Sequence, residues 1–315
     1  MSTSGGTRAI IAALLANTGI AVTKFVAFLL TQSSSMLAES IHSVADAGNQ
    51  GLLLLGGRRA RREASEKHPF GYGRERYIYA FIVAIVLFSV GGLFALYEGW
   101  HKLQDPHPID AWHWVPVAVL VAAIIMESFS FRTAIVESNH TRGDKSWKEF
   151  IRRARAPELP VILLEDFAAL VGLIFALFGV SLTLITDDGT WDGIGTLMIG
   201  VLLVSVAVVL AVETKSLLLG ESATEEDVAA IERALEAGPE VVRIIHLRTL
   251  HMGPEELLVA AKIGVHHDDS AASISRAIND AEARVRTAVP IARFIYLEPD
   301  IFVENHAGAA DADGS

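Results

Sequence analysis

The sequence predicts an all-α membrane part with six transmembrane helices, followed by a small cytoplasmic α+β domain. Of the 315 residues, 51% are hydrophobic and only 20% are charged, a composition typical of integral membrane proteins. Six apolar runs are each long enough to cross a bilayer, which takes about 20 residues. After Gly220 the charge density becomes that of a soluble protein, and no further apolar run of this length follows.

The six apolar runs also predict an orientation. The loop after the second run and the loop after the fourth run are rich in Lys and Arg, whereas the loops on the other side carry Lys102 alone. The positive-inside rule then puts both termini in the cytoplasm. Because no organelle signal is evident, we expect a multi-pass protein of the cell membrane, plasma or inner. The runs lie near 9–30, 35–57, 77–99, 113–136, 160–184 and 193–216.

This pattern divides the chain into three segments. Residues 1–220 form a six-helix transmembrane transport domain, and residues 221–303 form an α+β domain. We expect the tail, 304–315, to be disordered, because its residues are small and polar. In the second segment Thr224 precedes three acidic residues, which is typical of a helix start. Strand-like runs and an amphipathic helix follow, and the order α-β-β-α-β suits helices on one face of a sheet. The strands are expected at 241–252, 257–265 and 292–297, and the second helix at 273–288.

Charge and cysteine content narrow the chemistry. The formal net charge of −11 argues against a nucleic-acid partner. The chain has no cysteine, which excludes disulfides and thiolate metal sites. Any metal ion must therefore be held by His, Asp, Glu or Asn side chains.

The second apolar run carries ionisable residues at helical spacing. His42 and Asp46 are four residues apart and so share one face of a helix, and Asn49 continues that face three residues later. The fifth run contains Glu165 and Asp166. An imidazole and carboxylates can hold one divalent ion, and ionisable groups inside a membrane usually mark a transport pathway. A buried hydrogen-bonded pair with only a packing role is the alternative.

Four motifs make the chain resemble the cation diffusion facilitator family over nearly its whole length, most closely the branch that contains human zinc transporter nine. The resemblance implies six spanning helices, a cytoplasmic metallochaperone-like domain and a homodimer in the lipid membrane. It also implies export of a divalent metal, most often zinc, in exchange for protons. The motifs are SMLAESIHSVADAGNQ in the second run, HPFGYGRERY before the third, LLEDFAALVG in the fifth and HLRTLHMGP in the last domain.

Matched position by position, the resemblance implies a transport site made of His42, Asp46 and Asp166. Relatives with a complete site have a His where this chain has Ile162. Glu165 could replace it, although neighbouring helical residues point about 100° apart; a water, Asn49 or Asn17 are the other options. With one nitrogen donor the site is harder than a two-His site, so manganese, iron(II) and cobalt become alternatives to zinc.

The accessory metal positions of the family are incomplete here. His68 matches one of them, but its partner position is Tyr72, and a loop-shaping role is the alternative. His246 and Glu298 match ligand positions in the last domain, where Ala261 and Tyr296 stand in place of histidines. We therefore expect no two-metal cluster in that domain.

The predicted function is a secondary active transporter with no catalytic cofactor. Its cargo would be Zn²⁺, or Mn²⁺, Fe²⁺ or Co²⁺, and protons would be the counter-ion. His42 is expected to exchange protons, because imidazole does so near neutral pH. Three alternatives remain at this point: a membrane-embedded metallohydrolase, which would need an open coordination position and a general acid or base; a metal sensor; and a passive channel.

Overall fold

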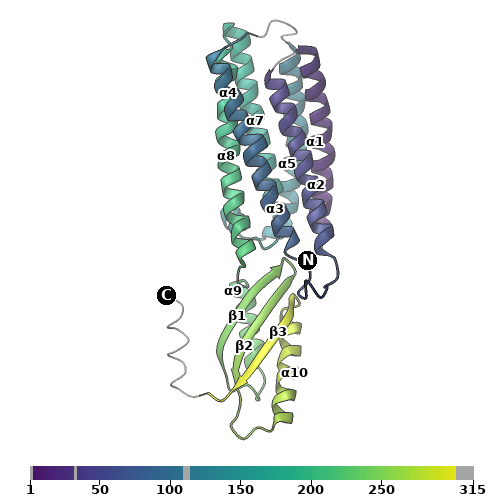
Figure 1. Ribbon diagram of the computed structural model, residues 1–315, viewed down its shortest axis with the longest axis vertical. Coiled ribbons are helices and arrows are strands. Elements are labelled where there is room, and N and C mark those ends of the chain that lie inside the picture. The colour runs from purple at the N-terminus through teal and green to yellow at the C-terminus, as the bar shows by residue number, and fades with distance from the viewer. Residues whose placement is uncertain (1–2, 32–33, 109–113, 303–315) are drawn as a thin grey trace. The chain divides into compact units, whose positions relative to one another are not determined.

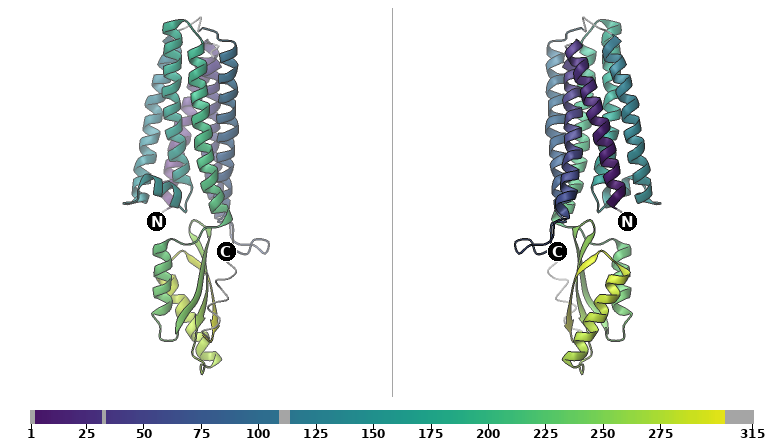
Figure 2. Two further views of the ribbon diagram at one scale, coloured as in Figure 1. Left: turned by 90° about the vertical axis from the view of Figure 1, so that its left-hand side faces the viewer. Right: turned by 90° about the vertical axis from the view of Figure 1, so that its right-hand side faces the viewer.

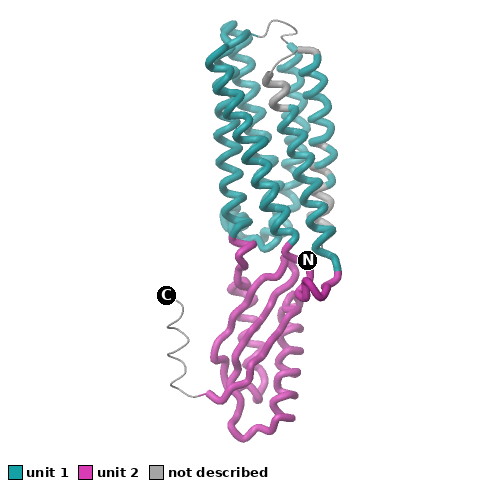
Figure 3. Tube along the Cα trace, viewed as in Figure 1, with its two compact units in different colours: residues 1–62, 75–215 teal, residues 63–74, 216–315 magenta. Residues whose placement is uncertain are grey.

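The structure is a computed structural model that describes residues 3–31, 34–108 and 114–302. Figure 1 shows long helices that run alongside one another and a smaller part that contains a sheet. The chain divides into two compact units. One comprises Met1–Arg62 and Glu75–Lys215, and the other comprises Glu63–Arg74 and Ser216–Ser315 (Figure 3).

The first unit is a bundle of long helices, which confirms the predicted all-α membrane part. The described part of each predicted apolar run lies in one continuous helix, and the third run corresponds to Glu75–Gln104. The described helices are α1 (Thr3–Thr31), α2 (Ser34–Ala60), α3 (Glu75–Val86), η1 (Leu87–Leu93), α4 (Phe94–Gln104), α5 (Trp114–Arg142), α6 (Trp147–Arg153), α7 (Glu158–Thr186) and α8 (Thr190–Leu219).

Four stretches of the described chain are long and apolar enough to cross a membrane: Glu75–Gln104, α5, α7 and α8. In α1 the apolar stretch is the shorter Asn17–Leu29. Helix α2 is more polar because it contains buried polar residues such as His42, Asp46 and Gln50. Large apolar side chains lie on the outer surface of these helices, among them Phe129 and Phe178. This is the expected surface of helices that contact lipid tails.

The third spanning helix contains a feature that the sequence analysis did not predict. Residues Glu75–Gln104 form one continuous helix, but its middle, η1, is a π-helix. π-helical turns are rare and often occur at functional sites. In this chain η1 contains Gly91, which lies beside His42 of α2, and Gly92, which lies against Val204 of α8.

The bundle is held by packing and by a paired charge near one end. α2 packs against α1 and α3, and α5 packs against α1 and α7, as the two side views in Figure 2 also indicate. Arg76 at the start of α3 binds Glu158 at the start of α7 through two hydrogen bonds, one of them 2.9 Å from Nη2 to Oε2. A bidentate pair of this kind fixes both distance and orientation.

The second unit confirms the predicted order α-β-β-α-β. Its elements are α9 (Glu225–Glu236), β1 (Arg243–Gly253), β2 (Glu256–Gly264), α10 (Ala271–Ala288) and β3 (Ala292–Asp300). The sheet order is β1-β2-β3, with β1 antiparallel and β3 parallel to β2. Thr224 caps α9 as predicted, because its side chain accepts a hydrogen bond from the Asp227 N–H. Buried side chains such as Ile231, Val259 and Val285 form the core.

Residues 63–74 belong to this second unit, whereas the sequence analysis assigned them to the membrane part. Phe70 packs edge to face on Phe294 of β3, with ring centroids 5.2 Å apart, and an apolar contact of this kind is stabilising. Gly73 lies against Gly253, so closely that a side chain there would meet the Gly253 Cα at 3.1 Å. The last domain is therefore assembled from two separate pieces of sequence. The predicted tail, 304–315, lies outside the described residues.

Candidate metal centre

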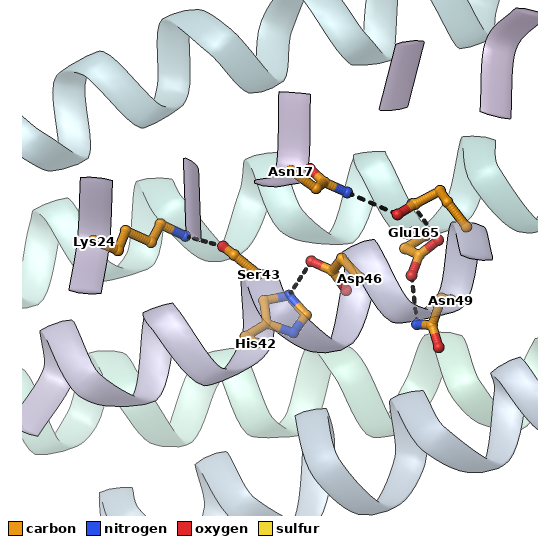
Figure 4. Close-up of polar contacts among 8 residues, drawn as sticks. Asn17, Lys24, His42, Ser43, Asp46, Asn49 and Glu165 are labelled. Carbon is orange, nitrogen blue, oxygen red and sulfur yellow. Dashed lines mark hydrogen bonds and ion pairs between the residues drawn. The ribbon is translucent and has the colours of Figure 1, made fainter. Parts of the chain in front are cut away.

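The centre begins with a pair on α2. His42 Nε2 and Asp46 Oδ2 are 3.4 Å apart, as their helical spacing predicts. Both residues are buried, with 8% and 2% of their surface exposed. Figure 4 shows the two side chains side by side inside the bundle, away from the helix ends.

Glu165 on α7 faces α2 and accepts hydrogen bonds from two amides. Asn49 Nδ2 donates to its Oε1 over 2.6 Å, and Gln50 Nε2 donates to its Oε2 over 3.1 Å. Asn17 Nδ2 of α1 in turn donates to Gln50 Oε1 over 3.3 Å. Amide donors stabilise a carboxylate, so this network holds Glu165 toward α2 (Figure 4).

Asp166 is held from a different side. The Ser130 hydroxyl of α5 donates to Asp166 Oδ2 over 2.8 Å. Asp46 is near enough to interact electrostatically with both Asp166 and Glu165. The three acids are thus one electrostatic group.

Three buried polar atoms at the centre have no hydrogen-bond partner among the described residues: His42 Nδ1, Asn49 Oδ1 and Asp166 Oδ1. Leaving a buried polar atom unpaired costs about 1–3 kcal/mol, and such atoms in a native fold point to water or an ion. Within the described ranges, however, no three His, Asp or Glu side chains already stand at metal-holding distances. The metal-donor side chains are therefore neighbours, but they do not point at one common position.

Two other elements border the centre. Gly91 of η1 lies beside the imidazole, and a side chain placed there would meet His42 Nδ1 at 3.5 Å. The π-helix thereby leaves space next to His42. Lys24 Nζ of α1 donates to Ser43 Oγ over 3.0 Å, a polar contact between neighbouring helices.

His42, Asp46, Asn49, Glu165 and Asp166 lie near one another inside the bundle, and Asn17, the other proposed donor, binds Gln50. Ile162, at the position of the missing histidine, is 1% exposed and packs in the apolar core. Sequence reasoning missed two residues, Gln50 and Ser130. Gln50 stands four residues after Asp46 and on its face of the helix, so spacing alone could have found it. A lone serine in an apolar helix, such as Ser130, gives no such signal.

The proposed accessory residues lie elsewhere and have other partners. His68 is exposed and its ring packs against that of Tyr72, with ring centroids 4.8 Å apart and the planes tilted by 54°. His246 and Glu298 flank Lys262 across the sheet, and Lys262 Nζ lies 3.1 Å from Glu298 Oε1 and 3.0 Å from Asp300 Oδ2. Hydrogen bonds to Asp300 and Glu298 raise the pKa of Lys262. An ammonium group therefore already engages Glu298.

Chemically, the centre offers one imidazole, three carboxyl groups and amide oxygen in an apolar bundle. Carboxylates so close together repel one another unless protons or a cation neutralise them. A divalent cation and protons are therefore alternative occupants of the same atoms, since metal ligands must lose their protons to bind.

Comparisons with known proteins agree with this chemistry. The chain matches the cation efflux transmembrane domain over residues 10–219. It is 33% identical over 242 residues to the human proton-coupled zinc antiporter SLC30A9, mitochondrial, covering 76% of this chain and 42% of that protein. It is 28% identical over 258 residues to metal tolerance protein C4 of Arabidopsis thaliana, covering 81% of this chain and 56% of that protein.

A solved MamM CTD structure matches 25% of this chain and 94% of its own, with 22% identity and a TM-score of 0.24. The chain spans about two fifths of the length of the human relative. The family match, in contrast, covers the bundle from α1 to the end of α8. This multi-pass membrane protein therefore belongs to the cation efflux family, whose members are transporters and not enzymes.

Proposed function

We propose that the protein exports a divalent metal ion from the cytoplasm in exchange for protons, with His42, Asp46 and Asp166 as ligands. Glu165 is the fourth donor in this proposal. It takes the role of the histidine that relatives have at the position of Ile162. The observation that carries it is the burial of an imidazole and three interacting carboxyl groups inside a membrane bundle. Ionisable groups are retained in such a place at high energetic cost and mark an ion pathway.

Zinc is the first choice of cargo. The human relative is named a zinc antiporter, and an imidazole with carboxylates is a known kind of zinc donor set. Manganese, iron(II) and cobalt are the alternatives, because oxygen donors outnumber nitrogen donors and Asn49 Oδ1 adds one more.

Proton coupling follows from competition for the same atoms. Facing the cytoplasm, the ligands release protons and bind the ion; facing the other side, protons return and displace it. Asp166 must turn an oxygen from Ser130 toward the ion, or use its unpartnered Oδ1. Movement of helices around the centre then supplies alternating access, as in other transporters with a central site.

The test is zinc uptake and proton flux in proteoliposomes. His42→Ala, Asp46→Ala and Asp166→Asn should each lower zinc-driven proton flux more than about a hundredfold, beyond the roughly 10- to 100-fold typical of losing a group that only orients a ligand. A matched control is His107→Ala, because His107 forms a similar pair with Asp105, 3.1 Å apart but exposed. Unchanged flux in His42→Ala would remove the proposal.

The same assay separates the other function classes. Zinc uptake that ignores the proton gradient would indicate a passive channel. Tight zinc binding without uptake would indicate a sensor, and hydrolysis of an added ester without uptake would indicate a metalloenzyme. Competition among zinc, manganese, iron(II) and cobalt at two pH values identifies the cargo.

We further propose a homodimer in the cell membrane with both termini in the cytoplasm. The basic loops at one end of the helices support the orientation. The human relative is named as mitochondrial, so fractionation of the source cells must decide between the two membranes. Mass measurement of the detergent-solubilised chain would show whether it is a dimer.

A further inference from the structure

A small cavity of about 20 Å³ lies beside the centre and is lined by residues of α2, η1, α4, α7 and α8. His42 lines it at one side and Asp192 and Thr196 of α8 at another, with apolar side chains such as Leu203 between them. A volume of this size holds about one water molecule. The cavity therefore connects a proposed ligand of the centre with polar groups that the proposed function does not use.

Asp192 forms an ion pair that lies mostly out of water. Lys102 Nζ of α4 lies 2.8 Å from Asp192 Oδ2, and the two side chains are 12% and 13% exposed. Lys102 Nζ also lies 3.5 Å from Thr196 Oγ1, which donates to the Asp192 carbonyl over 2.8 Å. The Asp192 N–H donates to Thr183 Oγ1 of α7 over 3.0 Å. The pair thus joins α4, α7 and α8.

Glycines bring α4 and α8 unusually close beside this pair. A side chain at Gly99 would meet Leu197 N at 2.8 Å, and one at Gly193 would meet Leu103 Cδ2 at 3.0 Å. Small residues allow such an approach between membrane helices. Because the helices cannot move closer here, any change in the distance between them is a separation, which would break the ion pair.

We propose that this cavity is part of the route of the divalent cation between the centre and the end of the bundle where α4 ends and α8 begins, and that the Lys102–Asp192 pair closes it. The proposal rests on the proposed function. While the pair is formed, the ammonium group of Lys102 neutralises Asp192 and repels a dication. When it breaks, Asp192 and Thr196 present oxygen atoms, which suit a divalent ion on its way to water.

The alternative is an ion pair that only joins helices. Such a pair would lower stability when broken, but it would work equally well with its charges exchanged. A cation route would not, because exchange puts a lysine on the cavity wall at position 192. Exchange of the two charges therefore distinguishes a structural ion pair from a cation route.

The first measurement is transport by the exchanged variant K102D/D192K in zinc-loaded proteoliposomes. We expect the melting temperature of K102D/D192K to lie within a few degrees of that of the wild type, because the ion pair can form again. Zinc transport by Asp192→Asn and by K102D/D192K should each be at least about tenfold slower than in the wild type, which corresponds to about 1.4 kcal/mol. Wild-type transport by K102D/D192K would overturn the proposal. If His42→Ala transports normally, the proposed function fails instead, and the two failures are distinguishable.

The second measurement does not depend on transport. The chain has no cysteine, so Ala95→Cys introduces a single thiol into the cavity wall. A membrane-impermeant cationic thiol reagent is applied from the side of the membrane where α4 ends. It should modify this thiol at least about tenfold faster when Lys102 is also changed to Gln. A tenfold change corresponds to about 1.4 kcal/mol, and breaking a largely buried ion pair in the wild type costs more than that.

Ala207→Cys on α8 is the control, since Ala207 is 1% exposed and does not line the cavity. It should stay unmodified in both backgrounds. Equal rates for Ala95→Cys with and without Lys102 would contradict the proposal, and so would modification of Ala207→Cys at the rate of Ala95→Cys.

Discussion

At the scale of single residues, the centre holds its carboxyl groups with neutral donors. Two amides bind Glu165 and one hydroxyl binds Asp166, while His42 pairs with Asp46. Neutral donors keep a carboxylate in position without cancelling its charge, so the charge remains available to a cation or to protons. A lysine or arginine in these places would have neutralised the site permanently.

Ser130→Ala tests this positioning role. Without the hydroxyl, Asp166 loses the donor 2.8 Å from its Oδ2 and becomes free to turn, so the zinc concentration for half-maximal transport should rise roughly 10- to 100-fold. The maximal rate should change less. Zinc uptake at graded concentrations measures both quantities.

Ser138→Ala provides the matched control. Ser138 lies on the same helix and is 0% exposed, but its hydroxyl has no hydrogen-bond partner among the described residues. It should therefore leave zinc affinity as it is. An equal loss in both variants would mean that Ser130 acts on the fold and not on Asp166.

At the scale of elements, periodicity and apolar length predicted each long helix, because burial of an apolar helix in a membrane needs little else. The π-helical segment η1 was not predictable in this way. Its extra width depends on neighbours: Gly92 lies against Val204 of α8, where a side chain would meet Cγ2 at 2.7 Å. Likewise, only packing reveals that residues 63–74 join the last domain.

Gly99→Ala tests the close approach of α4 and α8. The added methyl group would meet Leu197 N at 2.8 Å, and overpacking of this kind costs typically about 1–3 kcal/mol. The melting temperature of the detergent-solubilised chain should fall. In Gly51→Ala, by contrast, nothing lies within 4 Å of the new methyl group, and alanine favours a helix by roughly 1 kcal/mol. A rise in melting temperature for both variants would refute close packing at Gly99.

At the scale of the whole molecule, the chain separates a membrane bundle from a domain with an ordinary soluble core. The loop of residues 63–74 carries basic and glycine residues in the sequence and is part of the second unit. Segments that share one small domain without a spanning helix must lie on one side of the membrane. The second unit and this loop are therefore expected in the same compartment as each other.

Single cysteines test the orientation, because the chain has none of its own. In intact cells, a membrane-impermeant thiol reagent should modify Gln104→Cys, because Gln104 is the last residue of α4, at the end that the positive-inside rule predicts to be outside. It should modify Glu66→Cys only after permeabilisation. Both residues are exposed, so accessibility of the side chain is matched. The reverse pattern would contradict the positive-inside assignment.

The sequence by itself determined the six long helices and the α-β-β-α-β order of the last domain, and it predicted His42, Asp46 and Asp166 as the metal ligands. These depend on local properties: apolar length, alternation, capping and the four-residue spacing that puts His42 over Asp46.

Only the tertiary structure decided which donors hold the acids. Gln50 and Ser130 reach Glu165 and Asp166 across helix interfaces. Spacing places Gln50 on the face of Asp46, but it does not identify the acid that Gln50 binds, and it gives no signal for Ser130. The same is true of Lys102 and Asp192, which form one pair only because glycines let α4 and α8 approach. Local sequence thus determined which side chains each helix carries on each face, and packing determined which partners those side chains bind.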